Sequence, residues 1–309
     1  MENLTEPRSI HPISSALIFI LVVFLGFFVI GPLIGFFIAY PFYGGDFMQL
    51  ATELMSGQPS ERLKFPVLIL QGSATAFGLI AIPMFSYSIF ARQHIRNLFS
   101  RSSVLVFGLI AASVIAFMFP NSQIIEWNAN LNYDGAFWQW AKEREDLAEK
   151  FTKFFTTFNS SGEFLFAFFV IAVLPAVGEE FCFRGWLQPA LQKATGNPHI
   201  AIWLSAALFS AFHFQFFGFA PRMLLGAMFG YFMYWSGNLW IPITAHFVNN
   251  GLSLVMLYMN QLKIVEFDVE STEAVPILYV IPVTIVFVLL MIKLKKLFES
   301  REESNQPIQ

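Results

Sequence analysis

The sequence predicts an all-α, polytopic integral membrane protein with about eight transmembrane helices in one bundle. Of the 309 residues, 56% are hydrophobic and only 13% are charged, whereas soluble domains are roughly 45–50% apolar and about 25% charged. The 39 Phe residues exceed what one globular core could enclose. Several apolar runs also approach the roughly 20 residues that a helix needs to cross a bilayer.

Eight apolar runs account for the predicted helices. The first is too long for the apolar part of a signal peptide, so we expect it to remain as an anchor. Turns at Pro221 and at Gly237-Asn238 divide an otherwise continuous apolar stretch. The predicted spans are 16–40, 66–90, 103–120, 164–184, 199–217, 221–236, 239–260 and 274–293.

Charge in the short loops predicts the orientation, because cytoplasmic loops collect Lys and Arg. Basic residues mark the second loop and the C-terminal tail, and the loop 261–273 is acidic. With eight crossings, this pattern places both termini in the cytoplasm and the segment 121–162 outside. The residues behind this prediction are Arg92, Arg96, Arg101, Lys293, Lys295, Lys296 and Arg301 on the inside, and Glu266, Asp268, Glu270 and Glu273 on the outside.

The outer segment 121–162 contains an amphipathic stretch, with aromatic residues such as Trp138, Trp140 and Phe151 interleaved with charges. Two interpretations are open: a helix lying on the membrane surface, or a helix that caps the bundle from outside without touching lipid. The net charge of −3 gives no basic surface for nucleic acid, so no nucleic-acid partner is expected. The single Cys182 excludes an intrachain disulfide and is expected to serve packing.

Ionisable residues inside the spans are few, and each costs roughly 2.5–3.5 kcal/mol at the centre of a membrane helix. They form three clusters, one on each of the fourth, fifth and seventh spans. Because unrelated structural reasons are a poor explanation for three such clusters, they are the candidate functional residues. The clusters are Glu179, Glu180 and Arg184; His213; and His246 with Asn249 and Asn250.

Helix geometry gives these residues different tasks. Glu180 and Arg184 have the i,i+4 spacing of an intrahelical ion pair, which leaves Glu179 without a partner. If the fourth helix continues to a turn at 196–198, Glu179 and His213 lie at nearly equal distances from that turn and face each other in a helical hairpin. His246 and Asn250 share one face of the seventh helix, with Asn249 as the less favourable alternative.

A carboxylate, two imidazoles and an amide are the groups needed to add water to a carbonyl. Glu179 is the expected general base, and His213 would orient or polarise the water. His246 and Asn250 would donate hydrogen bonds to the oxyanion of the tetrahedral intermediate. The sequence has neither an H-E-x-x-H zinc-protease pair nor a G-x-S-x-G nucleophile elbow.

These residues resemble the motifs of a known family. Glu179-Glu180-x-x-x-Arg184, Phe209-x-x-x-His213 and His246-x-x-x-Asn250 look like the three motifs of the CPBP family, the type II CAAX-prenyl-endopeptidase-like or Abi intramembrane proteases. The resemblance implies an intramembrane endopeptidase that hydrolyses a peptide bond of a membrane-associated, possibly lipidated, substrate. It implies the same roles for Glu179, His213, His246 and Asn250, with Glu180, Arg184 and Phe209 in support.

Several alternatives stay open. No cofactor is favoured, but a divalent metal such as zinc would take Glu179, His213 and His246 as ligands. The metal-free interpretation is preferred because Asn250 suits an oxyanion and no carboxylate is visible behind either histidine. The rival functions are a proton-coupled transporter and a catalytically idle scaffold or immunity protein.

The expected location is a bacterial plasma (inner) membrane. The predicted organisation is a cytoplasmic tail (1–15), membrane helices with the outer segment (16–160), the protease-like membrane domain (161–260), and the last span with a cytoplasmic tail (261–309).

Overall fold

The structure, a computed structural model, describes residues 11–56, 60–90, 94–131, 134–266 and 272–305. Every regular element in these ranges is a helix, so the predicted all-α class is confirmed. Most of the predicted N-terminal tail lies outside the described residues. Arg92, Asp268 and Glu270, which contributed to the predicted orientation, also lie outside them.

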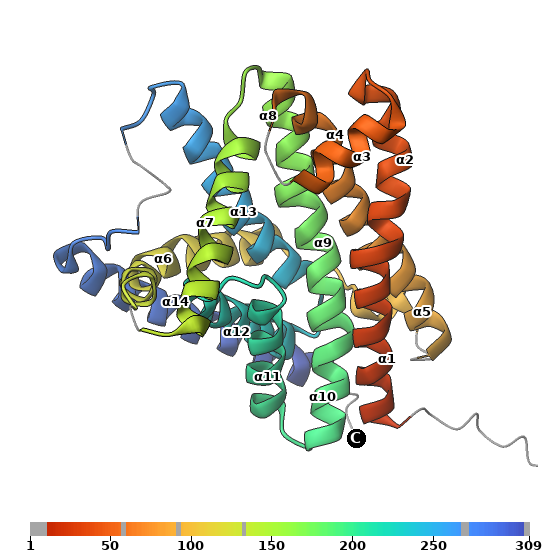
Figure 1. The fold of residues 1–309 in the computed structure, drawn as a ribbon. Coiled ribbons are helices and arrows are strands. Elements are labelled where there is room, and N and C mark those ends of the chain that lie inside the picture. The colour runs from red at the N-terminus through yellow and green to blue at the C-terminus, as the bar shows by residue number, and fades with distance from the viewer. Residues whose placement is uncertain (1–10, 57–59, 91–93, 132–133, 267–271, 306–309) are drawn as a thin grey trace, which may run out of the picture.

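Three long rods lie side by side (Figure 1). Each joins α-helical segments through π-helical turns, a feature that often accompanies functional sites. The first is α1 (Pro12–Leu25), η1 (Gly26–Ile30) and α2 (Gly31–Tyr43); the second is α4 (Glu61–Thr75), η2 (Ala76–Ala81) and α5 (Ile82–Phe90); the third is α8 (Ser161–Phe168), η4 (Phe169–Val173), α9 (Leu174–Glu180), η5 (Phe181–Leu187) and α10 (Gln188–Thr195).

The first two rods approach each other closely at glycines. A Cβ atom on Gly78 would lie 2.4 Å from the Cα of Phe27, and one on Gly31 would lie 2.6 Å from the Cα of Ala74. Backbone atoms occupy these positions, so a side chain could enter only if a rod moved. Small residues commonly allow this kind of close helix contact in membrane bundles.

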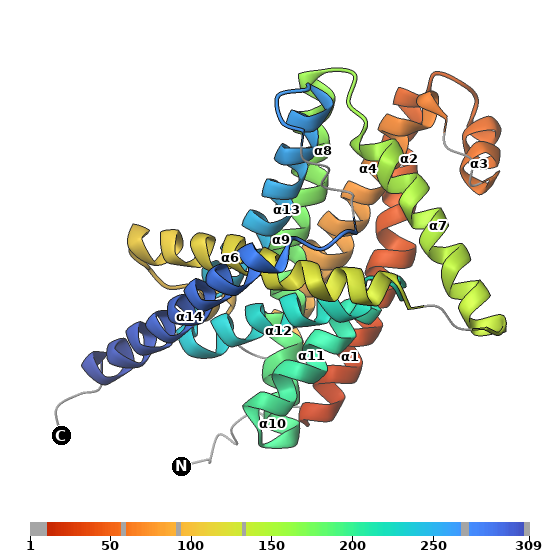
Figure 2. The ribbon, with the colours of Figure 1, turned by 90° about the vertical axis from the view of Figure 1, so that its left-hand side faces the viewer.

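Most of the remaining helices lie on one side of the rods, to the left in Figure 1, and α6, α12 and α14 run obliquely to them (Figure 1, Figure 2). These three pack on one another through fully buried apolar side chains, including Ile110, Phe229 and Leu294. The remaining elements are α3 (Phe47–Ser56), η3 (Ile95–Leu98), α6 (Val104–Ala129), α7 (Ala136–Thr156), α11 (Pro198–Ala211), α12 (Phe219–Ser236), α13 (Trp240–Gln261) and α14 (Ile277–Asn305).

Helices occupy all eight predicted positions, but the count of eight membrane spans is not confirmed. Five helices in the described ranges are long and apolar enough to cross a membrane, and α11 is shorter. The third rod does continue to the predicted turn, where Gly196 ends it with a φ of +67°. The five are Pro12–Tyr43, Glu61–Phe90, Val104–Ala129, Ser161–Thr195 and Ile277–Ser300.

Several predicted boundaries are wrong. α11 ends at Ala211 rather than at residue 217, because Phe214 takes a φ of +55° that no helix can continue. α12 begins at Phe219, so the turn precedes Pro221 instead of falling on it. α6 continues past Pro120 into the predicted outer segment, and α14 continues to Asn305.

Helix α7 is the predicted amphipathic stretch (Figure 2). Its C-terminal part caps the bundle, because Phe155 is buried in a cluster with Phe164 and Tyr258. Its N-terminal part leaves large apolar side chains exposed, with Phe137 at 53% and Trp140 at 48%. The C-terminal part of the helix therefore packs on the bundle, and whether the helix touches lipid stays a prediction.

Candidate active site

The third rod carries two neighbouring carboxylates at the middle of its length. Glu179 and Glu180 end α9, immediately before the π-helical turn η5. Because consecutive helix residues point about 100° apart, the two side chains face different neighbours. The side chain of Glu180 is fully buried, and that of Glu179 is 13% exposed.

Glu180 forms the predicted ion pair with Arg184. The Nη1 atom of Arg184 donates to Oε1 of Glu180 at 2.8 Å, and Nη2 donates to the carbonyl of Gly226 at 2.8 Å. The guanidinium lies 4.5 Å from the ring centre of Phe209. A Cβ on Gly226 would lie 3.1 Å from Nη2, so the small residue on α12 lets the buried arginine reach the backbone.

Glu180 also holds His246. The Nδ1 atom of His246 donates to Oε1 of Glu180 at 2.7 Å, and the ring stacks on Phe229 with centres 5.5 Å apart. The expectation that no carboxylate supports either histidine is therefore wrong for His246. The contact joins residues 66 positions apart, and it exists because α13 packs on α9, which no local pattern in the sequence indicates.

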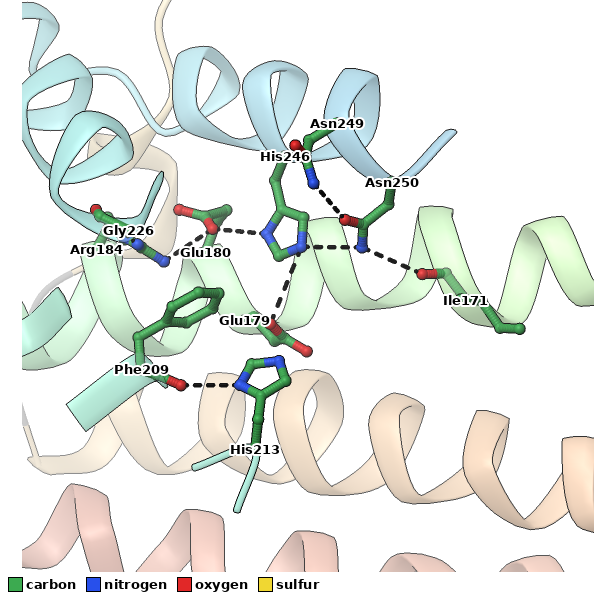
Figure 3. A network of polar contacts seen from close by, with 10 residues as sticks. All are labelled: Ile171, Glu179, Glu180, Arg184, Phe209, His213, Gly226, His246, Asn249 and Asn250. Atoms are coloured by element: carbon green, nitrogen blue, oxygen red, sulfur yellow. Dashed lines mark hydrogen bonds and ion pairs between the residues drawn. The ribbon is translucent and has the colours of Figure 1, made fainter. Parts of the chain in front are cut away.

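Two amides fix the other side of the His246 ring (Figure 3). Nδ2 of Asn250 donates to the carbonyl of Ile171 at 3.3 Å and contacts Nε2 of His246 at 3.1 Å. Nδ2 of Asn249 donates to Oδ1 of Asn250 at 3.1 Å. Because a carbonyl oxygen only accepts, the Asn250 amide can point only one way. Nε2 of His246 is therefore an acceptor, and the proton of the neutral ring is on Nδ1.

His213 lies in the turn after α11, not inside a helix as predicted. Its Nδ1 lies 2.9 Å from the carbonyl oxygen of Phe209. That oxygen can only accept, so Nδ1 carries the proton and Nε2 is an acceptor in the neutral ring. Figure 3 shows the imidazole beside the Glu179 carboxylate, which also points toward His246.

Acceptor atoms therefore converge at Glu179. Its Oε2 atom lies 4.0 Å from Nε2 of His246. Within the described part of the chain, this buried oxygen has no hydrogen-bond partner. Nε2 of His213 is a third acceptor at the same place. Groups that complement such a cluster are those that supply hydrogens or positive charge, such as water.

A metal ion would also complement acceptors, and Glu179, His213 and His246 are the predicted ligands for one. Across the described ranges, no three His, Cys, Asp or Glu side chains are arranged to hold a metal ion, the set Glu179, His213 and His246 included. Nε2 of His246 already accepts a hydrogen bond from Asn250. Metal independence remains a prediction.

A second polar network, not predicted from the sequence, lies beside the site. Nη2 of Arg222 donates to Oε1 of Gln215 at 2.9 Å, and Nε2 of Gln215 donates to Glu145 of α7 at 3.4 Å. Arg222 lies within electrostatic reach of Glu179 and His213. Its position inside the predicted span 221–236 was the signal that could have identified it.

Cys182 lies between Glu180 and Arg184 in the sequence and, among the described residues, forms no hydrogen bond with the polar groups of the site. Its thiol is fully buried and donates to the carbonyl of Leu79 at 3.3 Å. This agrees with the expected packing role, because a buried thiol in apolar surroundings is a poor nucleophile.

The fold and the site together define a class: an all-helical integral membrane protein with a buried acid, histidine and asparagine cluster where its helices meet. Comparison with known families gives the same answer, since residues 161–252 match the family described as type II CAAX prenyl endopeptidase Rce1-like. This match confirms the family resemblance of the three motifs, and the matched range contains Glu179, His213, His246 and Asn250.

Among curated proteins, the chain is similar to "Uncharacterized protein YpbD" of Bacillus subtilis (strain 168). The two are 29% identical over 109 residues, which cover 33% of this chain and 53% of YpbD. The match thus spans about half the length of this relative. No solved structure matches the chain.

Proposed function

We propose that the protein is an intramembrane endopeptidase that uses water activated by Glu179 to hydrolyse a peptide bond of a membrane-associated substrate. The observation that carries the proposal is the convergence of Glu179 Oε2 with His246 Nε2, 4.0 Å apart in a buried site. A carboxylate held among acceptors is suited to take a proton from a bound water. The Rce1-like match supports the reaction class.

His213 and Asn250 have complementary tasks in this proposal. Nε2 of His213 accepts a hydrogen bond from the attacking water and orients it toward the scissile carbonyl. In the resting site, Nδ2 of Asn250 donates to the carbonyl of Ile171 and to Nε2 of His246. When Nε2 takes a proton, the second hydrogen of Nδ2 is released and can stabilise the developing oxyanion. Each donor of this kind is typically worth a few kcal/mol in the transition state.

His246 needs a proton before it can join the oxyanion site, because Nε2 of its neutral ring is an acceptor. Glu180 lies behind the ring at 2.7 Å and would stabilise the imidazolium. The proton that Glu179 takes from water can pass to Nε2 and then to the leaving amine. His246 is thus an oxyanion donor during part of the cycle rather than throughout it.

The test is cleavage of a lipid-anchored peptide by the purified protein in nanodiscs. The probe is a farnesylated fluorogenic peptide with a C-terminal CAAX sequence. We expect wild type to cleave it and Glu179→Gln to lose about 10²–10⁴-fold of the rate. Glu149→Gln is the matched control, because that carboxylate is 62% exposed on α7 and its loss should leave the rate unchanged.

Two other outcomes would contradict the proposal. Cleavage by Glu179→Gln at the wild-type rate would remove Glu179 from the reaction. If wild type cleaves none of a panel of lipidated and unlipidated peptides, the result favours the transporter or scaffold function over a protease.

Treatment with a chelator tests whether the reaction needs a metal ion. We expect prolonged treatment with EDTA or phenanthroline, followed by buffer exchange, to leave the cleavage rate unchanged, because Glu179 and the histidines suffice in this proposal. Loss of activity that zinc restores would show that Glu179, His213 and His246 act as ligands.

A further inference from the structure

Arg222 carries a buried donor that the proposed mechanism does not use. Of the two terminal nitrogens, Nη2 donates to Gln215. Nη1 is buried and has no hydrogen-bond partner among the described residues. Glu145 accepts from Gln215 and lies within electrostatic reach of the guanidinium, but it forms no direct ion pair with it in the described part of the chain.

Leaving such a donor unsatisfied is costly. A buried group without its hydrogen bond costs about 1–3 kcal/mol, and a charged group costs more. The fold nevertheless makes room for the guanidinium here, since a Cβ on Gly218 would lie 2.8 Å from Nη2. An arginine held in this way, with one nitrogen free, is suited to a ligand oxygen that arrives from outside the chain.

The surroundings indicate how a ligand could approach. A cavity of about 180 Å³ lies between the start of α7 and the turn that precedes α12, and its lining includes Trp138, Lys142 and Phe217. The residue after Phe217 is Gly218, which packs on Arg222. The cavity and the guanidinium therefore lie beside the same turn. Asp134 also lines the cavity, so its charge is mixed.

We propose that Arg222 is a specificity-determining residue that binds a carboxylate of the peptide substrate through Nη1, close to the bond being cleaved. This inference rests on the proposed function, because it takes the ligand to be the peptide. Guanidinium–carboxylate pairs are the strongest hydrogen-bonded pairs available to a peptide ligand, and burial strengthens them. The carboxylate can be the chain terminus or an Asp or Glu side chain.

Matched peptides distinguish the two sources. One pair of farnesylated fluorogenic peptides ends in a free carboxylate or in an amide, and the other carries Glu or Gln next to the scissile bond. With wild type, we expect one pair to differ about tenfold or more in KM, with a smaller change in kcat. In Arg222→Gln this difference in KM should fall below about threefold. Arg222→Lys should keep part of the difference, because lysine keeps the positive charge but lacks the paired N–H donors of the guanidinium.

The control is Arg144→Gln, which removes the same charge from an exposed position on α7 and should keep the wild-type preference. If wild type cleaves both members of both pairs with equal KM, the inference is overturned while the proposed function stands. An equal loss of rate for all four peptides in Arg222→Gln would also overturn it, since it would indicate a structural role.

Binding provides a readout that does not depend on catalysis. Fluorescence anisotropy of the same labelled peptides against the Glu179→Gln protein in nanodiscs should show tighter binding of the carboxylate form, lost with Arg222→Gln added. If wild type cleaves none of the peptides, the proposed function fails, and the binding measurement alone tests whether Arg222 binds a carboxylate. Equal affinity for the carboxylate and uncharged forms contradicts it.

Discussion

Nδ1 of His246 and Nη1 of Arg184 donate to the same oxygen, Oε1 of Glu180, at 2.7 and 2.8 Å. The second acid of the motif therefore has two partners, one from its own rod and one from α13. Arg184 neutralises the buried carboxylate, and the carboxylate sets the tautomer of His246. Glu180 thus acts through His246 as a positioning residue.

Replacing Glu180 should affect stability and activity together. In Glu180→Gln, Arg184 becomes a buried charge without a counter-charge, and breaking such a pair costs about 3–5 kcal/mol. The amide can also present a donor to Nδ1, which would favour the wrong tautomer of His246. We expect a clearly lower melting temperature and about 10²-fold slower cleavage. Glu149→Gln, which breaks an exposed i,i+4 pair with Lys153, should change neither.

Asn249 should matter through Asn250. Its Nδ2 donates to Oδ1 of Asn250, which helps to direct the Asn250 amine toward the site. Asn249→Ala removes this support and should slow kcat by up to about tenfold, because one supporting hydrogen bond contributes roughly 0.5–1.5 kcal/mol. Asn249→Asp places an acceptor against Oδ1 and should be slower still. Equal kcat for the two variants would contradict this role.

The tautomers of both site histidines can be measured directly. Neutral His213 and His246 should carry their protons on Nδ1, because the partners there are the carbonyl of Phe209 and the carboxylate of Glu180. Selective ¹⁵N-histidine NMR of the protein in nanodiscs should show a protonated Nδ1 and an unprotonated Nε2 for each ring. Assignment follows from single His→Gln variants. A protonated Nε2 at neutral pH in either ring would refute the assignment for that ring.

Two glycines give a matched test of rod packing. A Cβ on Gly78 would lie 2.4 Å from the backbone of Phe27, whereas one on Gly108 would meet nothing within 4 Å. Gly78→Ala should therefore destabilise the protein by at least about 1–3 kcal/mol. Gly108→Ala should be neutral or slightly stabilising, because alanine favours a helix interior. Unfolding in mixed detergent micelles, followed by circular dichroism, compares the two.

Local sequence patterns predicted much of this architecture. Apolar runs identified the positions of the main helices, and Gly196-Asn197-Pro198 marked the end of the third rod because each residue has a strong local preference there. The end of α11 at Ala211 could not be predicted, because the run 199–217 stays largely apolar beyond that residue. The turn that ends the helix depends on the backbone conformation of Phe214, which no local pattern indicates. Apolar composition also could not decide which helices span a membrane.

For the candidate site, the chemical groups and the contacts within one rod or helix, such as Glu180 with Arg184 and His246 with Asn250, could be predicted from the sequence. These follow from helical periodicity, which is a local property. Only the packing of separate helices shows that Glu180 supports His246 and that Arg222 borders the site, with an Nη1 atom that has no hydrogen-bond partner among the described residues. Both depend on how separate helices pack, and packing is set by the shapes of many side chains at once rather than by spacing along the chain.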